Sequence, residues 1–469
     1  MARNTLLWRS LAIGGSLALV LSACGSDDGG EETTETPEAA GEATEDAGSS
    51  ATNASDGTLT VGTLLPETGS LAYLGPPEFA GVTLAVQDIN EAGGVLGNDV
   101  VQIDTDSGDT TSNIAQQSVD SLLSQNADVI IGAASSSVSL SVLDKIIGAK
   151  VAMVSPANTS TAFTDYDDDG FYWRTAPSDI LQGRILGDAV LADGYQNVAI
   201  LALQDAYGET LVEQATISLE NGGATVVFSE FYDPKATDFS AIIDEASSTN
   251  PDAVILIGFD ETKTIIPQTV SRNFGPQDVP YFFVDGNIAD YSDDFDPGTL
   301  TGTKATLPGA DSSDEFKQRL QDSYGELDSF AYAGESYDAV TLVALAAEAA
   351  GDDSGEAIAS QLQAVSADGT TCTSFAECKE LLDAGEDIDY DGISGPVDWD
   401  ENGDTTAASI GIYEYAEDNT YSPVDFIFNE NITATTNCTM HFRSSQLLER
   451  RFFSSSYLCQ SRRTDISCG

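Results

Sequence analysis

The stretch from residue 59 to residue 106 reads "LTVGTLLPETGSLAYLGPPEFAGVTLAVQDINEAGGVLGNDVVQIDTD". It opens and closes with short apolar runs typical of β-strands, "LTVGTLL" and "VVQIDTD". Between them, residues 78–91 carry apolar side chains at helical spacing, namely Phe79, Val82, Val86 and Ile89. The pair Gly93–Gly94 then ends the predicted helix. The stretch therefore predicts a strand–helix–strand unit.

The same alternation continues along the chain for about 250 residues. A helix is predicted over 111–124, and further apolar segments resemble buried strands: "ADVIIGA", "VAMVSP", "NVAILAL", "ATVVFSEF", "DAVILIG" and "PYFFVD". Strands that are apolar almost throughout indicate parallel sheets covered by helices on both faces. One small sheet could not hold so many strands, so we predict an α/β fold of two Rossmann-like doubly wound lobes.

Small hydroxyl residues follow two of these strands directly. "IIGAASSSVS" covers residues 130–139 and "VAMVSPANTST" covers residues 151–161. In a parallel sheet both runs lie at the ligand-bearing edge, beyond the carboxyl ends of the strands. The serines could be ordinary helix caps, or they could bind a polar ligand with the N–H groups of a helix start. One serine can cap a helix while its neighbours bind, and a ligand site is favoured.

The chain begins with the layout of a secretory signal. Arg3 and Arg9 precede a short apolar run, residues 11–21, that is too short for a permanent membrane span. The run ends in "LSAC", which resembles the lipobox of bacterial lipoproteins and implies lipidation of Cys24; a plain secretory signal with a chance cysteine is the alternative. From Gly25 to Gly57 there are ten acidic residues and no Lys or Arg, which predicts a disordered tether. We therefore expect a domain anchored outside the cell membrane.

Charge excludes some partners and marks the end of the fold. The formal net charge of −59 is incompatible with nucleic-acid binding, which needs clustered Lys and Arg. Residues 25–430 hold 11 basic against 75 acidic residues, whereas five Arg and two acids follow from residue 431. We expect the fold to end near Phe428 and the rest to be disordered or aberrant sequence.

Catalytic machinery is not evident. The single histidine, His441, lies in the atypical tail, so Ser–His–Asp and Cys–His catalysis and most zinc sites are disfavoured. The chain has no GxxxxGK loop, no GxGxxG after the first strand and no GxSxG elbow. We predict a protein that is not an enzyme and needs no cofactor.

One segment partly fits a calcium loop. "DIDYDGISGPVD" spaces its acids as such a loop would, with Asp387, Asp389, Asp391 and Asp398 as candidate ligands. The twelfth position is Asp rather than Glu, and no amphipathic helix follows. Acidic turns are the favoured interpretation, and no metal is predicted.

Two cysteines stand six residues apart in "CTSFAEC". In an exported domain thiols oxidise, so Cys372 and Cys378 are predicted to form a local disulfide that clamps a short surface turn.

Several motifs together resemble one family. "GTLLPETGSLAYLGPPEFAGVTLAVQDINEAGGVLG" is similar to the start of bacterial extracellular solute-binding proteins of the leucine/isoleucine/valine type, which serve ABC importers. "IIGAASSS", "VSPANTST", "LQDAYGET", "FVDG" and "YDAVTLVALAAEAA" follow in that family's order. The resemblance, over roughly residues 59–415, implies two lobes joined by three hinge strands that close on a small amino acid and then engage a permease. We expect a monomer.

The resemblance also implies roles for individual residues. Ser136 and Thr159 match positions that hold the ligand carboxylate. The backbone carbonyl of Ala157 would face the ligand's ammonium group, and Asp285 would pair with it.

Three aromatic residues would form the walls of the site, Tyr73 from the first lobe and Tyr207 and Phe259 from the second. Asn158 replaces a small apolar residue of the family, and we expect it to change polarity near the ligand. Phe259 lacks the hydroxyl often found there, so strict branched-chain specificity is not implied.

The expected organisation has five parts: signal 1–23, tether 24–57, first lobe 58–176 with about 306–392, second lobe 177–305 with about 393–428, and tail 429–469. The same scaffold could instead bind urea, short amides or aromatic acids. It could also serve as a sensory or adhesive surface receptor without transport.

Overall fold

The computed structural model describes residues 54–432. The predicted signal, Cys24, nearly all of the tether and the tail after residue 432, with His441, lie outside the described residues. In the part of the chain that is described, no helix has the length and apolar character needed to cross a membrane.

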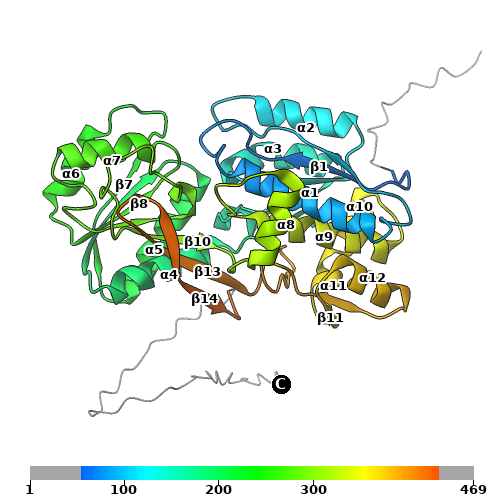
Figure 1. The fold of residues 1–469 in the computed structure, drawn as a ribbon. Helices are drawn as coiled ribbons and strands as arrows, with labels where there is room; N and C mark the ends of the chain where they lie inside the picture. The colour runs from blue at the N-terminus through cyan, green and yellow to red at the C-terminus, as the bar shows by residue number, and fades with distance from the viewer. Residues whose placement is uncertain (1–53, 433–469) are drawn as a thin grey trace, which may run out of the picture. The chain divides into compact units, whose positions relative to one another are not determined.

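The first lobe is built on a parallel five-stranded sheet. Its order is β2 (Val101–Ile103), β1 (Thr60–Leu64), β3 (Val129–Gly132), β4 (Ala152–Ser155) and β5 (Tyr172–Arg174). Helices α1 (Gly75–Glu91) and α9 (Ala333–Ala350) pack on one face, and α2 (Ile114–Ser124) and α3 (Ser136–Gly148) pack on the other (Figure 1). Covering both faces explains why the strands are apolar almost throughout.

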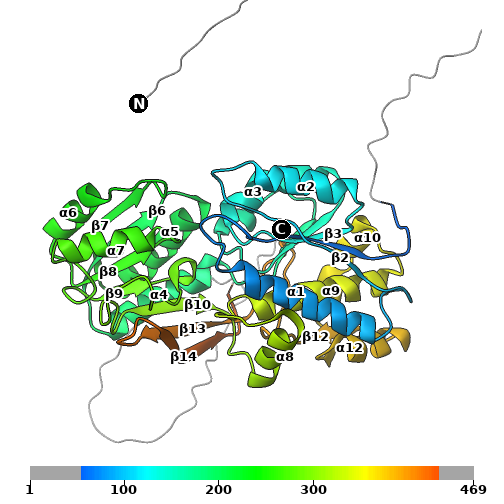
Figure 2. The same cartoon turned by 45° about the horizontal axis from the view of Figure 1, so that its top comes forward.

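The second lobe is built on a seven-stranded sheet. Its order is β14 (Tyr421–Asn429), β13 (Ala408–Tyr415), β10 (Lys304–Pro308), β9 (Tyr281–Phe283), β8 (Ala253–Ile257), β6 (Asn197–Leu203) and β7 (Thr225–Tyr232). Strand β13 runs antiparallel to both of its neighbours, β10 and β14. The other strand pairs of this sheet are parallel. Helices α4 (Asp179–Ala192) and α5 (Ala206–Asn221) cover one face, and α6 (Ser240–Ser248) and α7 (Thr262–Ser271) cover the other (Figure 2).

The remaining elements complete the first lobe. They are α8 (Asp314–Tyr324), α10 (Gly355–Ala359), α11 (Leu362–Ser366), α12 (Phe375–Asp383) and the parallel pair β11 (Thr370–Cys372) and β12 (Ile388–Tyr390). The chain crosses between the lobes after β5, after β10 and between β12 and β13. Two short 3₁₀ turns, Thr161–Phe163 and Asp285–Asn287, follow β4 and β9.

The predicted fold is confirmed: two doubly wound lobes are present, and each of the eight predicted strands overlaps an observed one. Helix α1 starts at Gly75, three residues before the prediction, because Pro76 and Pro77 are tolerated in a first turn. The sequence did not reveal six strands. Strands β5, β11 and β12 are very short, and β10 was also missed. In the antiparallel strands β13 and β14, partly exposed side chains interrupt the apolar run.

The strand in "IIGAASSS" stops at Gly132 for a steric reason. This residue has φ +133°, and a Cβ there would lie 2.1 Å from the carbonyl oxygen of Leu64 on the neighbouring strand. Ser135 then caps α3, since its hydroxyl accepts a hydrogen bond from the Val138 N–H. The capping interpretation is therefore correct for Ser135, and Ser136 is left for another role.

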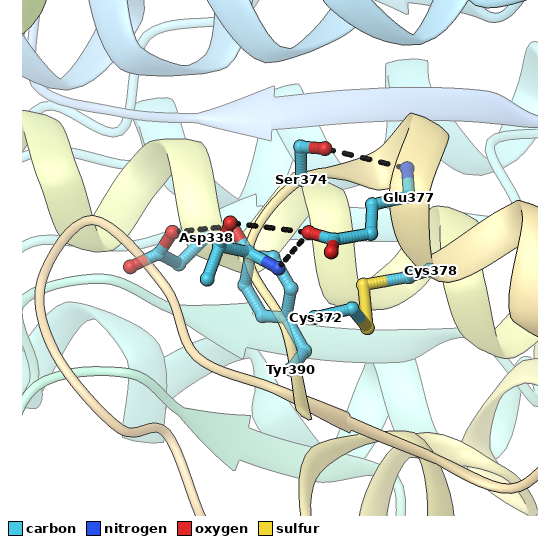
Figure 3. The surroundings of a disulfide bond; sticks show 7 residues. Asp338, Cys372, Ser374, Glu377, Cys378 and Tyr390 are labelled. Atoms are coloured by element: carbon cyan, nitrogen blue, oxygen red, sulfur yellow. Dashed lines mark hydrogen bonds between the residues drawn. A yellow bond between two sulfur atoms is a disulfide. The ribbon is translucent and has the colours of Figure 1, made fainter. Parts of the chain in front are cut away.

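The cysteines Cys372 and Cys378 form a disulfide between β11 and α12 (Figure 3). Both residues are at most 1% exposed and belong to the core of the first lobe. The bond clamps a short turn whose residues Thr373 and Glu377 are exposed at the surface, as predicted, while the two cysteines themselves are buried beneath it. Ser374 caps α12 by accepting from the Glu377 N–H.

The segment 387–398 is folded as a strand followed by a tight turn. Asp389 lies within strand β12, paired with β11, and Asp391 bridges to Pro396 in a tight turn. Within residues 54–432 no three His, Cys, Asp or Glu side chains are grouped so that they could hold a metal ion.

Candidate ligand-binding site

A small cavity lies between the lobes at the carboxyl ends of the strands. The first lobe contributes loops after β1, β3 and β4, and the second contributes residues after β6, β8 and β9. Its walls are Leu71, Leu74, Ala134, Ser135, Ser136, Ala157, Tyr207, Phe259, Asp285, Gly286 and Tyr332. This is the edge at which doubly wound sheets bind ligands.

Asp285 is the charged group of this cavity and is only 5% exposed. Its Oδ1 accepts hydrogen bonds from the Tyr207 hydroxyl and the Gln182 amide, both at 2.6 Å. Its Oδ2 accepts one from the Tyr332 hydroxyl at 2.7 Å. Burial raises the pKa of Asp285, and these neutral donors offset only part of that shift. No ion pair within the described residues involves this carboxylate.

A second acid, Asp179, is fully buried nearby at the start of α4. Burial raises its pKa to about 7, although a hydrogen bond from the Thr210 hydroxyl lowers it. Asp179 Oδ1, Gln182 Oε1 and Thr159 Oγ1 are among the buried side-chain atoms that lack a hydrogen-bond partner in the described part of the chain. Unpaired buried polar atoms are costly, and a bound ligand is one way to satisfy them.

Across the cavity, Ser136 begins helix α3 and is 2% exposed. Its hydroxyl accepts from the Ser160 N–H at 3.4 Å. The first N–H groups of a helix have no acceptor inside the helix, and the helix dipole adds positive potential there. The cavity thus has a carboxylate on one side and an anion-attracting helix start on the other.

Comparison with known proteins shows the family to which the chain belongs. The sequence pattern of the periplasmic binding proteins matches residues 58–419, most of the chain. The protein belongs to this family. The curated relatives include a chemotactic signal transduction substrate-binding protein of Halobacterium salinarum, 28% identical over 72% of this chain and 83% of its own. A leucine-, isoleucine-, valine-, threonine- and alanine-binding protein of Pseudomonas aeruginosa is 24% identical over 76% and 90%.

Solved structures of periplasmic binding proteins share the fold. A leucine-binding protein from Thermotoga maritima superposes with a TM-score of 0.65 at 22% identity, covering 79% of this chain and 98% of its own. A solute-binding protein from R. palustris in complex with 4-hydroxybenzoate gives 0.66 at 18% identity, covering 80% and 98%. The family is that of periplasmic, and so extracytoplasmic, binding proteins, and the relatives named above bind amino acids or an aromatic acid.

In this periplasmic binding protein, five of the seven predicted site residues line the cavity: Ser136, Ala157, Tyr207, Phe259 and Asp285. Tyr207 stacks on Phe259 with ring centroids 5.6 Å apart, forming one wall. Thr159 is buried outside the lining. Tyr73 instead joins the lobes, because its hydroxyl donates to the Gly286 carbonyl at 2.7 Å.

The expected effect of Asn158 on ligand polarity is wrong. Its amide nitrogen donates to the carbonyls of Ala133 and Ala134, both at 2.9 Å. Its amide oxygen accepts from the Tyr172 hydroxyl at 3.0 Å. All its polar atoms are used inside the first lobe, so the side chain braces the two strand ends.

Three important residues escaped the sequence reasoning: Tyr332, Gln182 and Asp179. Tyr332 stands alone just before α9 in a left-handed conformation, with φ 59°, and no periodic pattern marks it. Asp179 and Gln182 open helix α4, where an acid and an amide look like ordinary first-turn residues. The only available signal for Asp179 and Gln182 was their position directly after the first lobe crossing.

Proposed function

We propose that this protein captures a small amino acid with an apolar side chain, branched-chain or similar, and delivers it to an ABC importer. The observation that carries the proposal is the environment of Asp285, a buried carboxylate held by three neutral donors and no base. An ammonium group would supply the missing charge. The start of α3 opposite it suits a carboxylate, so the cavity is matched to both ends of a zwitterion.

The remaining walls of the cavity indicate the ligand's third group. Leu71, Leu74 and Phe259 are apolar and nearly inaccessible to water. Apolar walls with few polar groups favour an aliphatic side chain over a charged one.

Aromatic acids are a weaker fit, although one structural relative binds 4-hydroxybenzoate. Such a ligand has no cation to pair with Asp285, so a desolvated charge would remain in the closed cavity. Urea and short amides have no carboxylate for the helix start.

The test is calorimetric titration with leucine and two truncated analogues. Leucinamide lacks the carboxylate and 4-methylpentanoate lacks the ammonium group. We expect leucine to bind and each analogue to bind at least roughly a hundred-fold more weakly, since each leaves a buried charge-assisted contact unmade. Binding of 4-hydroxybenzoate more tightly than any amino acid would refute the proposal.

A sensory role is the second candidate, because a relative with 28% identity is a chemotactic signal transduction protein. The ligand would be the same, and the partner would be a membrane receptor rather than a permease. Deleting the gene for this protein separates the two roles: loss of amino-acid uptake supports transport, and loss of chemotaxis without loss of uptake supports sensing.

We further propose that Cys24 anchors the protein to the membrane through a lipid. The support is the "LSAC" sequence and the acidic segment that follows it. Replacing Cys24 by serine is expected to move the protein from the membrane fraction to the soluble fraction without changing ligand affinity. If the Cys24→Ser protein stays with the membranes in the same proportion as wild type, the anchor lies elsewhere.

A further inference from the structure

A second and larger cavity adjoins the hinge. It has a volume of about 260 Å³ and lies among the loop after β10, the loop between α8 and α9, and strands β13 and β14. Tyr332 lines both this hinge cavity and the amino-acid cavity. The proposed function makes no use of this hinge cavity.

Glu335, in the first turn of α9, lines the hinge cavity and is only 4% exposed. Its carboxylate forms no hydrogen bond or ion pair with another residue of the described chain. Gly309 makes room for it, because a Cβ there would lie 2.5 Å from Glu335 Oε1. Burial raises the pKa of Glu335 to about 8, as expected for a carboxylate without a nearby cation.

The charge around Glu335 is also negative. Asp290, Asp311 and Asp328 line the same cavity, and Lys317 is the one base among its lining residues. Lys317 is already paired, since its ammonium lies 3.1 Å from Asp311 Oδ1. Behind Glu335, both carboxylate oxygens of the fully buried Glu78 are without a hydrogen-bond partner in residues 54–432. An anion is therefore excluded from this cavity.

Aromatic rings supply the other walls of the hinge cavity, from Phe330, Tyr332, Tyr413 and Tyr421. Tyr413 and Tyr421 meet edge to face at 5.6 Å. The Lys317 ammonium lies 5.9 Å from the centre of the Phe330 ring, which shows that a cation is tolerated over these rings. Aromatic rings beside carboxylates are the usual surroundings of an alkylated ammonium, and the described residues contain no metal-binding group of acids.

We propose that the hinge cavity binds a small organic cation with an alkylated ammonium group, independently of the amino-acid ligand. Glu335 would pair with the charge, and the aromatic rings would surround the alkyl groups.

The experiment uses choline as the probe, titrated by calorimetry into wild type and into Asp285→Asn, which disables the amino-acid cavity. We expect one choline per protein with equal affinity in both. The neutral isostere 3,3-dimethylbutan-1-ol should bind at least roughly ten-fold more weakly. Glu335→Gln should weaken choline binding by a factor of roughly ten or more, and Lys317→Gln should strengthen it by roughly two- to five-fold by removing a competing positive charge.

The absence of saturable choline binding would overturn the proposal. So would loss of binding in Asp285→Asn, because the choline would then occupy the amino-acid cavity, or an unchanged affinity in Glu335→Gln. If Glu335→Gln does not fold, Tyr421→Leu at the edge of the cavity gives an independent answer. It should lower the affinity by roughly five-fold, and an unchanged affinity would overturn the proposal equally.

Discussion

Replacing Asp285 by asparagine is expected to weaken amino-acid binding by about 2 to 4 kcal/mol, which is roughly thirty-fold to a thousand-fold in Kd. The variant keeps the size of the side chain but removes the buried charge that would pair with the ligand's ammonium group. Calorimetry with the best amino-acid ligand measures the change. Because burial already raises the pKa of Asp285, its charged form does not favour folding, so the variant should not unfold more easily.

Ser136→Ala is the matched variant on the opposite lobe. It should cost less, about 1 to 2 kcal/mol, because the backbone N–H groups at the start of α3 remain available to the carboxylate. Equal and small losses in both variants would mean that neither residue contacts the ligand's charged ends.

Replacing Arg174 by methionine is expected to lower the free energy of unfolding by about 3 to 5 kcal/mol. Arg174 is fully buried at the end of β5, and its guanidinium donates to Asp404 at 2.6 Å and to the Ser160 carbonyl at 2.8 Å. Asp404 lies on the third lobe crossing, so the pair fastens that crossing to the first sheet. Removing the base leaves a desolvated carboxylate with no counter-charge. Urea denaturation followed by circular dichroism measures the loss.

Arg272→Met is the control for the buried pair. Arg272 pairs with Asp244 at 3.0 Å on the surface, where solvent screens the charges, and its loss should cost less than about 1 kcal/mol. The double variant Arg174→Met with Asp404→Leu should recover part of the stability, because no buried charge is then unpaired. A single Arg174 variant as stable as the Arg272 variant would show that the buried pair contributes nothing.

Much of the fold was available from the sequence because it depends on local patterns. Strands buried on both faces must be apolar at every position, so β6 is continuous in the sequence as "NVAILAL" and its bounds were predicted without error. The helix stop at Gly93–Gly94 and the cap at Ser135 involve residues within a few positions of one another. The ligand edge then follows from the topology of parallel sheets.

The sequence by itself thus determined the two α/β lobes, the edge that carries the site and five of the eleven residues lining it. Only the tertiary structure decided how those residues act. Asp285 receives its hydrogen bonds from residues 47, 78 and 103 positions away, and nothing local marks Tyr332 or Gln182 as its partners. In the same way, only the tertiary structure shows that Asn158 turns into the first lobe and that Cys372 and Cys378 are buried in its core. Side-chain direction and burial depend on contacts between distant segments, which residue type and spacing do not encode.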